Sequence, residues 1–405
     1  MIGMTIPEHD EASKAKADPV SSRPGVMVRN PGKPIILSNV EFNGVSAEAA
    51  MRGTSVKVWT RATMCSEQAV FHRVAPNLIS VIRHCAQQAG EYPALLHAST
   101  ILLVIKPDNT AALWIDAAAV MNETRLKRNA SSGTVLFESD IADVTGMWFP
   151  LVDVATEDRI IVLFREGFRF GLFFDFNPGG HLNIEDAKRD LGTLCRQMRY
   201  ADLYSVLANE ATFKRVVAAG WFPFIEIMTG DFGTLSNACE AGFPLLEAEA
   251  ELAKKFTCEC LDRMFDRWMS RPHFKEKEAI LRSGVKAYKE GDWVACLKVV
   301  LTEIEGIIAE AYFASTGQHT RRISKLLEFT LDTATKMAGG KDTLFFPVEF
   351  AHYLRHYTYA DFDVESNQPS VARNAVGHGR AKPEHYTQSR ALQALLTLDQ
   401  FAFYS

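Results

Sequence analysis

The chain has 405 residues, of which 47% are hydrophobic and 23% charged, and its formal net charge at pH 7 is −5. This is the composition of an ordinary globular protein, long enough for two or three domains whose cores need no metal or disulfide to hold them together. The negative balance excludes attraction of nucleic acid by the overall charge, so contact with RNA or DNA requires a local basic patch.

The seven cysteines are scattered and odd in number, which indicates a reduced, intracellular protein rather than a disulfide scaffold. Cys258 and Cys260 lie two positions apart without a matching pair downstream, so no metal site is predicted. No apolar run is long enough to span a bilayer, and Glu8, Asp10 and Glu11 interrupt the start where a signal peptide would be basic and then apolar. We therefore predict a cytoplasmic protein with no membrane contact and no cofactor.

The first 34 positions are polar and rich in Lys, Ser, Pro and Gly, and they are predicted to form a flexible tail. Residues 35–202 mix strand and helix patterns, beginning with a short strand at 35–37, and they are assigned to a mixed α/β domain. They contain no glycine-rich phosphate loop, no HExxH and no GxSxG. The sequence therefore assigns no chemistry to this domain.

Hydrophobic periodicity and turn residues place two hairpins and two helices within this domain. One hairpin turns at Pro107-Asp108-Asn109, and the second has an arm dense in phenylalanine, which indicates packing against an apolar surface. The expected elements are a helix at 71–88, strands at 102–105 and 112–115, strands at 160–164 and 168–176, and a helix at 184–197.

The rest of the chain is predicted to be helical. Residues 203–273 form a connecting region, with a break at Gly220-Trp221-Phe222-Pro223 and a long amphipathic helix at 245–268. Residues 274–405 form an all-helical module, in which Asp292 is the expected N-cap of the second helix. Its helices are expected at about 280–288, 293–313, 323–329, 346–357 and 386–403. The fold class is therefore α+β overall, with an all-α C-terminal bundle.

One carboxylate breaks the apolar pattern of the module. Glu305 lies between Leu301 and Ile308 at helical spacing, on the stripe that is expected to be buried. Because an unpaired buried carboxylate is costly, Glu305 should have a cationic partner, and an arginine before the last helix is the nearest candidate. A structural ion pair and a role in an active site remain equally open.

The candidate site is the segment before the last helix, Arg373-Asn374-Ala375-Val376-Gly377-His378-Gly379. Glycines on both sides of His378 would let the backbone turn and present the imidazole, which can exchange a proton near neutral pH. Arg373 can hold a phosphate by two hydrogen bonds. The spacing alone is unspecific, because the chain repeats it from Arg267 to His273 and from Arg380 to His385.

The surroundings of the motif resemble the HEPN superfamily, and within it the Apea-like group. The matching features are Asn374 after the arginine, the His378-Gly379 pair, the leucine-rich last helix with Leu398-Asp399-Gln400, and Tyr288-Lys289-Glu290-Gly291-Asp292-Trp293 followed by Ile304-Glu305-Gly306. The resemblance covers about residues 274–404, a third of the chain.

The resemblance implies a metal-independent endoribonuclease, in bacterial defence or a stress response, whose motif meets a second copy across a homodimer interface. His378 would be the general acid or base, Arg373 would stabilise charge on the phosphate, Asn374 would orient the pair or contact RNA, and Glu305 would orient Arg373. Two other interpretations stay open: a non-catalytic HEPN-like dimer that binds RNA, nucleotide or a protein, and a histidine that only bonds to backbone. The roles of Arg380 and His385 also stay open.

Overall fold

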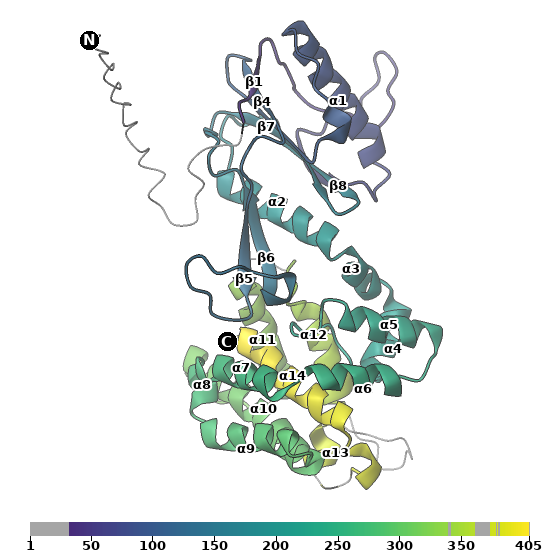
Figure 1. The fold of residues 1–405 in the computed structure, drawn as a ribbon, viewed down its shortest axis with the longest axis vertical. Coiled ribbons are helices and arrows are strands. Elements are labelled where there is room, and N and C mark those ends of the chain that lie inside the picture. The colour runs from purple at the N-terminus through teal and green to yellow at the C-terminus, as the bar shows by residue number, and fades with distance from the viewer. Residues whose placement is uncertain (1–31, 339–341, 361–372, 378, 380, 405) are drawn as a thin grey trace, which may run out of the picture.

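A computed structural model describes residues 32–338, 342–360, 373–377, 379 and 381–404. A β-sheet occupies the N-terminal part of the chain and helices occupy the C-terminal part (Figure 1), so the predicted α+β class is confirmed. The predicted tail lies almost entirely outside the described residues. Within the described residues, no helix is both long and apolar enough to cross a membrane.

The N-terminal part contains a six-stranded sheet in which every pairing is antiparallel, in the order β1-β4-β3-β7-β8-β2. Both predicted hairpins are confirmed as β3 with β4 and β7 with β8, while β2 was not expected. The strands are β1 (Ile35–Leu37), β2 (Arg61–Cys65), β3 (Thr100–Ile105), β4 (Ala111–Ile115), β7 (Arg159–Glu166) and β8 (Arg169–Asp175).

Two helices cover the two faces of this sheet, which explains why the middle residues of its central strands are apolar on both faces. Alternate residues of β3 point to opposite faces: Leu103 packs in one cluster with α1 (Phe71–Gln88), and Leu102 packs in another with α2 (Ile184–Arg199). In β8, Phe174 and Phe173 divide in the same way. The phenylalanine-rich arm therefore supplies two cores, as its apolar density indicated.

A two-stranded ribbon, which the sequence did not predict, lies between the sheet and the helices (Figure 1). It pairs β5 (Met121–Leu126) with β6 (Ile141–Trp148) and has register shifts beside Thr124 and Leu126. Those irregularities interrupt the alternation of side chains on which strand prediction depends. Ala142 and Val144 of β6 belong to the core of the helical part, so the ribbon anchors that part to the sheet domain.

The ribbon lies against α2 through two glycines. A Cβ atom on Gly192 would lie 2.4 Å from the Cα of Gly146. We expect Gly192→Ala to lower the free energy of unfolding by about 1–3 kcal/mol, because the backbones of α2 and β6 would have to separate. Urea denaturation measures this. The control is Gly233→Ala in α5, where a Cβ would meet no atom within 4 Å and we expect no loss of stability. Equal losses in both variants would contradict the close contact.

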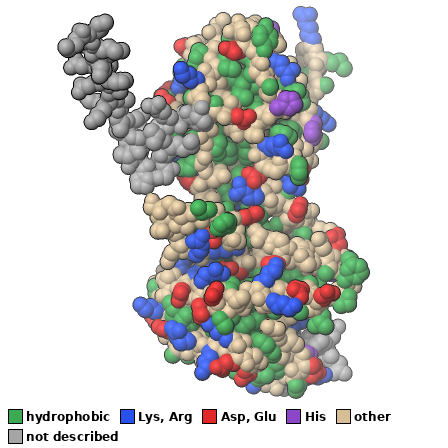
Figure 2. Space-filling model, viewed as in Figure 1, with side chains coloured by type: hydrophobic (Ala, Val, Ile, Leu, Met, Phe, Trp, Pro, Cys, Tyr) green, Lys and Arg blue, Asp and Glu red, His purple; other side chains and the backbone are tan. Residues whose placement is uncertain are grey.

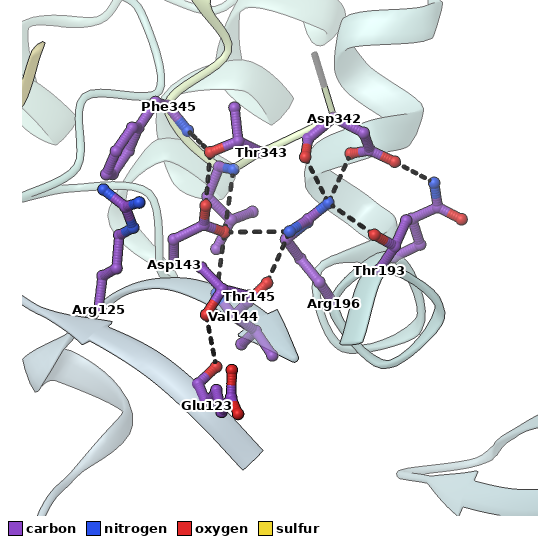
Figure 3. A network of polar contacts seen from close by, with 12 residues as sticks. Glu123, Arg125, Asp143, Val144, Thr145, Thr193, Arg196, Asp342, Thr343 and Phe345 are labelled. Atoms are coloured by element: carbon purple, nitrogen blue, oxygen red, sulfur yellow. Dashed lines mark hydrogen bonds and ion pairs between the residues drawn. The ribbon is translucent and has the colours of Figure 1, made fainter. Parts of the chain in front are cut away.

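A buried polar junction also joins the sheet domain to the helices (Figure 3). Arg196 of α2 lies 3.4 Å from the carboxylate of Asp143 in β6 and donates to the carbonyl of Asp342 at 2.6 Å. Asp143 in turn accepts hydrogen bonds from the hydroxyl of Thr343 and the amide of Leu344. Side chains from two parts of the chain thus fix the segment that enters α12.

The helical part is one packed unit. Its helices are α3 (Ala201–Ala208), α4 (Glu210–Ala218), α5 (Asp231–Ala241), α6 (Leu246–Lys255), α7 (Cys258–Met269), α8 (Pro272–Lys275), α9 (Glu278–Lys289), α10 (Trp293–Thr316), α11 (Ile323–Ala338), α12 (Pro347–Tyr353), a π-helical turn (Leu354–Thr358), α13 (Arg373–Gly377) and α14 (Gln388–Tyr404). One hydrophobic cluster includes residues from before and after position 273. The predicted division between 203–273 and 274–405 therefore does not separate two cores.

Three local features of the helical part can be compared with the sequence predictions. Asp292 caps α10 by accepting a hydrogen bond from the amide of Ala295 at 2.9 Å, as predicted. The break after α4 is confirmed at Gly220, whose φ is +84°. The single helix predicted at 245–268 is wrong: α6 ends at Lys255, and Thr257 caps a separate helix, α7.

The last helix, α14, is buried on every side rather than on one leucine-rich face. All residues from Ala391 to Tyr404 are buried. It contacts α6, α7, α9, α10 and α11. Its polar residues have partners, since Gln400 accepts from the amide of Ile225 and Gln393 donates to the carbonyl of Ala219. The helix is therefore the central element of the bundle, which explains why polar side chains occur within a leucine-rich sequence.

Candidate active site at Arg373

The segment around Arg373 begins as a helical turn, not as the loop that the sequence predicted. α13 packs against α10, and its residues Ala375 and Val376 are both buried. With these two residues directed inward, Arg373 remains partly exposed at the edge of the turn. The chain then reverses at Gly379, where φ is +66°, and the amide of Ala381 donates to the carbonyl of Ala375. The reversal agrees with the expected role of this glycine.

Glu305 and Arg373 form the ion pair that the sequence predicted. The Nη2 atom of Arg373 lies 2.6 Å from the Oε2 atom of Glu305 on α10. The side chain of Arg373 is 29% exposed and that of Glu305 is 22% exposed, so the pair lies at a half-buried surface rather than in the core. The expected burial of Glu305 is met in part, because its Oε2 atom is buried. At this distance the carboxylate of Glu305 stabilises the charge of the guanidinium, and both side chains keep part of their surface in solvent.

Tyr359, which sequence reasoning did not single out, lies beside this pair. Burial raises the pKa of its phenol, with a further upward contribution from the charge of Glu305 that Arg373 opposes. The phenol therefore stays protonated at neutral pH and is a hydrogen-bond donor rather than a charge. Tyr359 follows the π-helical turn after α12 and lies outside the motif at 373–379. The sequence therefore carries no signal that links it to Arg373.

The other predicted site residues are described only in part. The backbone of Asn374 belongs to α13, but its side chain is outside the description, and His378 and Arg380 lie outside the described residues. His385 ends a short turn (Pro383–His385), is half-buried, and has no hydrogen-bond partner for its Nδ1 atom among the described residues. The structure thus brings Arg373 and Glu305 together and leaves the relation of Arg373 to His378 as a prediction.

The repeat of the motif that begins at Arg267 has a different environment. The guanidinium of Arg267 contacts the carboxylates of Asp399 at 2.7 Å and of Glu226 at 2.6 Å. The indole of Trp268 also donates to Asp399, at 2.7 Å. These bonds join α7 to α14 and to the segment before α5. Arg267 is therefore a structural residue of the bundle.

Burial raises the pKa of Asp399 to about 6, although Arg267 opposes the shift. Glu226 adds to it, because two carboxylates share one guanidinium. The sequence signal for this network is Asp399, an acidic residue within a leucine-rich helix. Its partners, Arg267 and Trp268, are far from it in sequence and meet it only in the fold. Asp399 and Gln400, which are part of the HEPN resemblance, are both buried and hydrogen-bonded within the bundle.

No family model matches this chain, and neither a curated protein nor a solved structure is significantly similar to it. The HEPN resemblance therefore rests on the residues of the chain alone.

Proposed function

We propose that the C-terminal helices form a HEPN-type domain and that the protein is a metal-independent endoribonuclease whose site includes Arg373 and His378. The observation that supports this most directly is the half-buried ion pair between Arg373 and Glu305. It holds a guanidinium, a group well suited to bind a phosphate, at a half-buried surface. The other support is the sequence resemblance around His378.

The proposed reaction is a transesterification within RNA. The 2′-oxygen attacks the adjacent phosphorus, and the bond from phosphorus to the 5′-oxygen breaks. A base takes the proton of the 2′-hydroxyl, and an acid gives a proton to the departing 5′-oxygen, leaving a 2′,3′-cyclic phosphate and a 5′-hydroxyl. His378 performs one of these proton transfers and Arg373 stabilises the charge on the phosphate. A second histidine, from the partner in a homodimer, performs the other.

The test is cleavage of a panel of labelled RNAs by the full-length protein in EDTA. We expect His378→Ala and Arg373→Ala each to reduce the rate by about a hundredfold or more, since positioned acid–base and charge-stabilising groups contribute on that scale. Products should carry 5′-hydroxyl ends that a kinase labels without prior dephosphorylation. Loss of all cleavage in EDTA, or equal rates in wild type and both variants, would contradict the proposal.

Glu305 has a matched control on the same helix. Glu303 is also half-buried and lies 3.0 Å from the ammonium of Lys277. We expect Glu305→Gln to lower the cleavage rate because Arg373 loses its orientation, whereas Glu303→Gln should cleave RNA like wild type. The proposed homodimer is tested separately by analytical ultracentrifugation, in which the full-length protein should sediment as a dimer. Wild-type protein that binds RNA without cleaving any of the panel would instead support a non-catalytic binding platform.

A further inference from the structure

A second concave site lies where the ribbon meets the helical bundle. Two of the elements that line it, β5 and α7, lie at the opposite end of the helical part from α13 (Figure 1). It is a pocket of about 630 Å³. Its walls come from β5 and the turn after it, from α7, and from the ends of α6 and α14. Figure 2 shows lysine and arginine side chains gathered on this face below the ribbon.

The pocket is strongly basic although the whole chain is acidic. Seven lysine and arginine side chains and four carboxylates line it, an excess of three positive charges. If Asp399, which binds Arg267 but does not line the pocket, is also counted, the excess falls to two positive charges. Arg125, Lys127 and Arg128 come from the ribbon, whereas Arg263 belongs to α7. A positive excess concentrated in one concavity raises the local concentration of anions.

Several of these cations have no carboxylate to neutralise them. Arg128 is bound by Asp140, and Arg267 by Glu226 and Asp399. By contrast, among the described residues Lys127, Arg263 and Arg271 form no ion pair, and Arg271 donates only to the carbonyl of Ala402.

Lys127 is a partly buried cation of this pocket. Its carbonyl accepts from Arg267 at 2.6 Å, so its backbone is fixed, while its ammonium forms no hydrogen bond among the described residues. Burial lowers the pKa of Lys127, and the charges of Glu226, Asp399 and Asp140 oppose this shift. A partly desolvated ammonium without a partner is unfavourable, and an anion in the pocket would compensate it.

We infer that this pocket binds a small molecule carrying two or more phosphate groups, held by Lys127, Arg263 and Arg271. The volume lies in the range of small-molecule sites, about 300–1,000 Å³. The cations converge from separate elements into one concavity, which suits a compact polyanion. A nucleic-acid strand would instead require a basic stripe along the surface. This site is independent of the proposed ribonuclease site, because the two share no residue.

The test is isothermal titration of the full-length protein with inorganic tripolyphosphate, ATP, inorganic phosphate and a single-stranded RNA. We expect tripolyphosphate to bind and inorganic phosphate to bind at least about tenfold more weakly, because it carries one phosphate group where the pocket offers several cations. Tighter binding of ATP than of tripolyphosphate would identify the ligand as a nucleotide, and equal binding would identify it by its phosphates alone. Either result supports the inference.

The decisive variants are Lys127→Gln and the exposed Arg263→Gln, with Lys298→Gln and Arg321→Gln as exposed controls elsewhere on the helices. We expect each pocket variant to weaken tripolyphosphate binding by about tenfold, the effect of one lost charge-assisted contact, and the controls to bind like wild type. Arg263→Gln keeps the test valid if Lys127→Gln does not fold. The inference is overturned if tripolyphosphate and ATP do not bind, if all four variants bind alike, or if only RNA binds.

Discussion

Replacing Arg196 with methionine is expected to lower the free energy of unfolding by about 3–5 kcal/mol, because Asp143 would become a buried carboxylate without its cation. Asp143 is completely buried, and Arg196 is only 2% exposed. The same change removes the hydrogen bonds from Arg196 to the carbonyls of Val144 and Asp342, both at 2.6 Å. Those acceptors lie on the ribbon and on the segment before α12, so one substitution loosens the junction between the two parts of the chain.

Urea denaturation of wild type and variant at pH 7 measures the loss. The control is Arg189→Met on the same helix, where an exposed pair with Asp186 contributes at most about 0.5 kcal/mol. A third variant, Asp143→Leu with Arg196→Met, removes both charges and should recover part of the stability, because the buried carboxylate is gone. If Arg196→Met and Arg189→Met cost the same, the junction does not hold the parts together.

The second expected result concerns Arg267→Met, which should cost about 3–5 kcal/mol near pH 8 because Asp399 and Glu226 lose their shared cation. The loss should shrink on acidification. Burial already raises the pKa of Asp399 to about 6 in the presence of Arg267, and removing a neighbouring positive charge raises it further. A carboxyl whose pKa is higher in the folded than in the unfolded protein takes up a proton on folding, so the folded variant gains stability as the pH falls through that value.

Unfolding curves of wild type and Arg267→Met at pH 8, 7, 6 and 5 test both parts of this expectation. Arg263→Met is the matched control, since Arg263 lies one turn earlier on α7, is exposed and forms no ion pair among the described residues. Its difference from wild type should be small and constant with pH. A deficit in Arg267→Met that stays constant from pH 8 to pH 5 would show that Asp399 does not carry the cost.

Elements with one strong periodicity were predictable. The helix at 71–88 has the bounds expected from its apolar spacing, and both hairpins of the sheet follow from turn residues between apolar runs. The ribbon was not predictable, because β5 is mostly polar and its pairing with β6 is irregular. The break between α6 and α7 was missed because Phe256, four residues after Leu252, continues the apolar spacing although the backbone leaves the helix there.

For the candidate site, local spacing predicted one contact and missed the others. Glu305 stood out because it interrupts an apolar stripe, and that conflict correctly required a cation, found at Arg373. The basic pocket had a weaker signal: Arg125, Lys127 and Arg128 are close in sequence, but Arg263 approaches them only through the packing of α7 against the ribbon. Spacing along the chain cannot report a cluster that tertiary structure assembles.

The central position of α14 has a consequence for how the protein forms during synthesis. The two hydrophobic clusters of the sheet contain no residue beyond Met198, so they can close while the remainder is still being made. The helical cluster cannot, because it surrounds a helix that is translated after all the others described here. Until α14 emerges from the ribosome, α6, α7, α9, α10 and α11 expose the surfaces that it later covers. The nascent chain therefore presents a folded sheet domain followed by helices whose apolar surfaces are still exposed. Chaperones bind chains in this state.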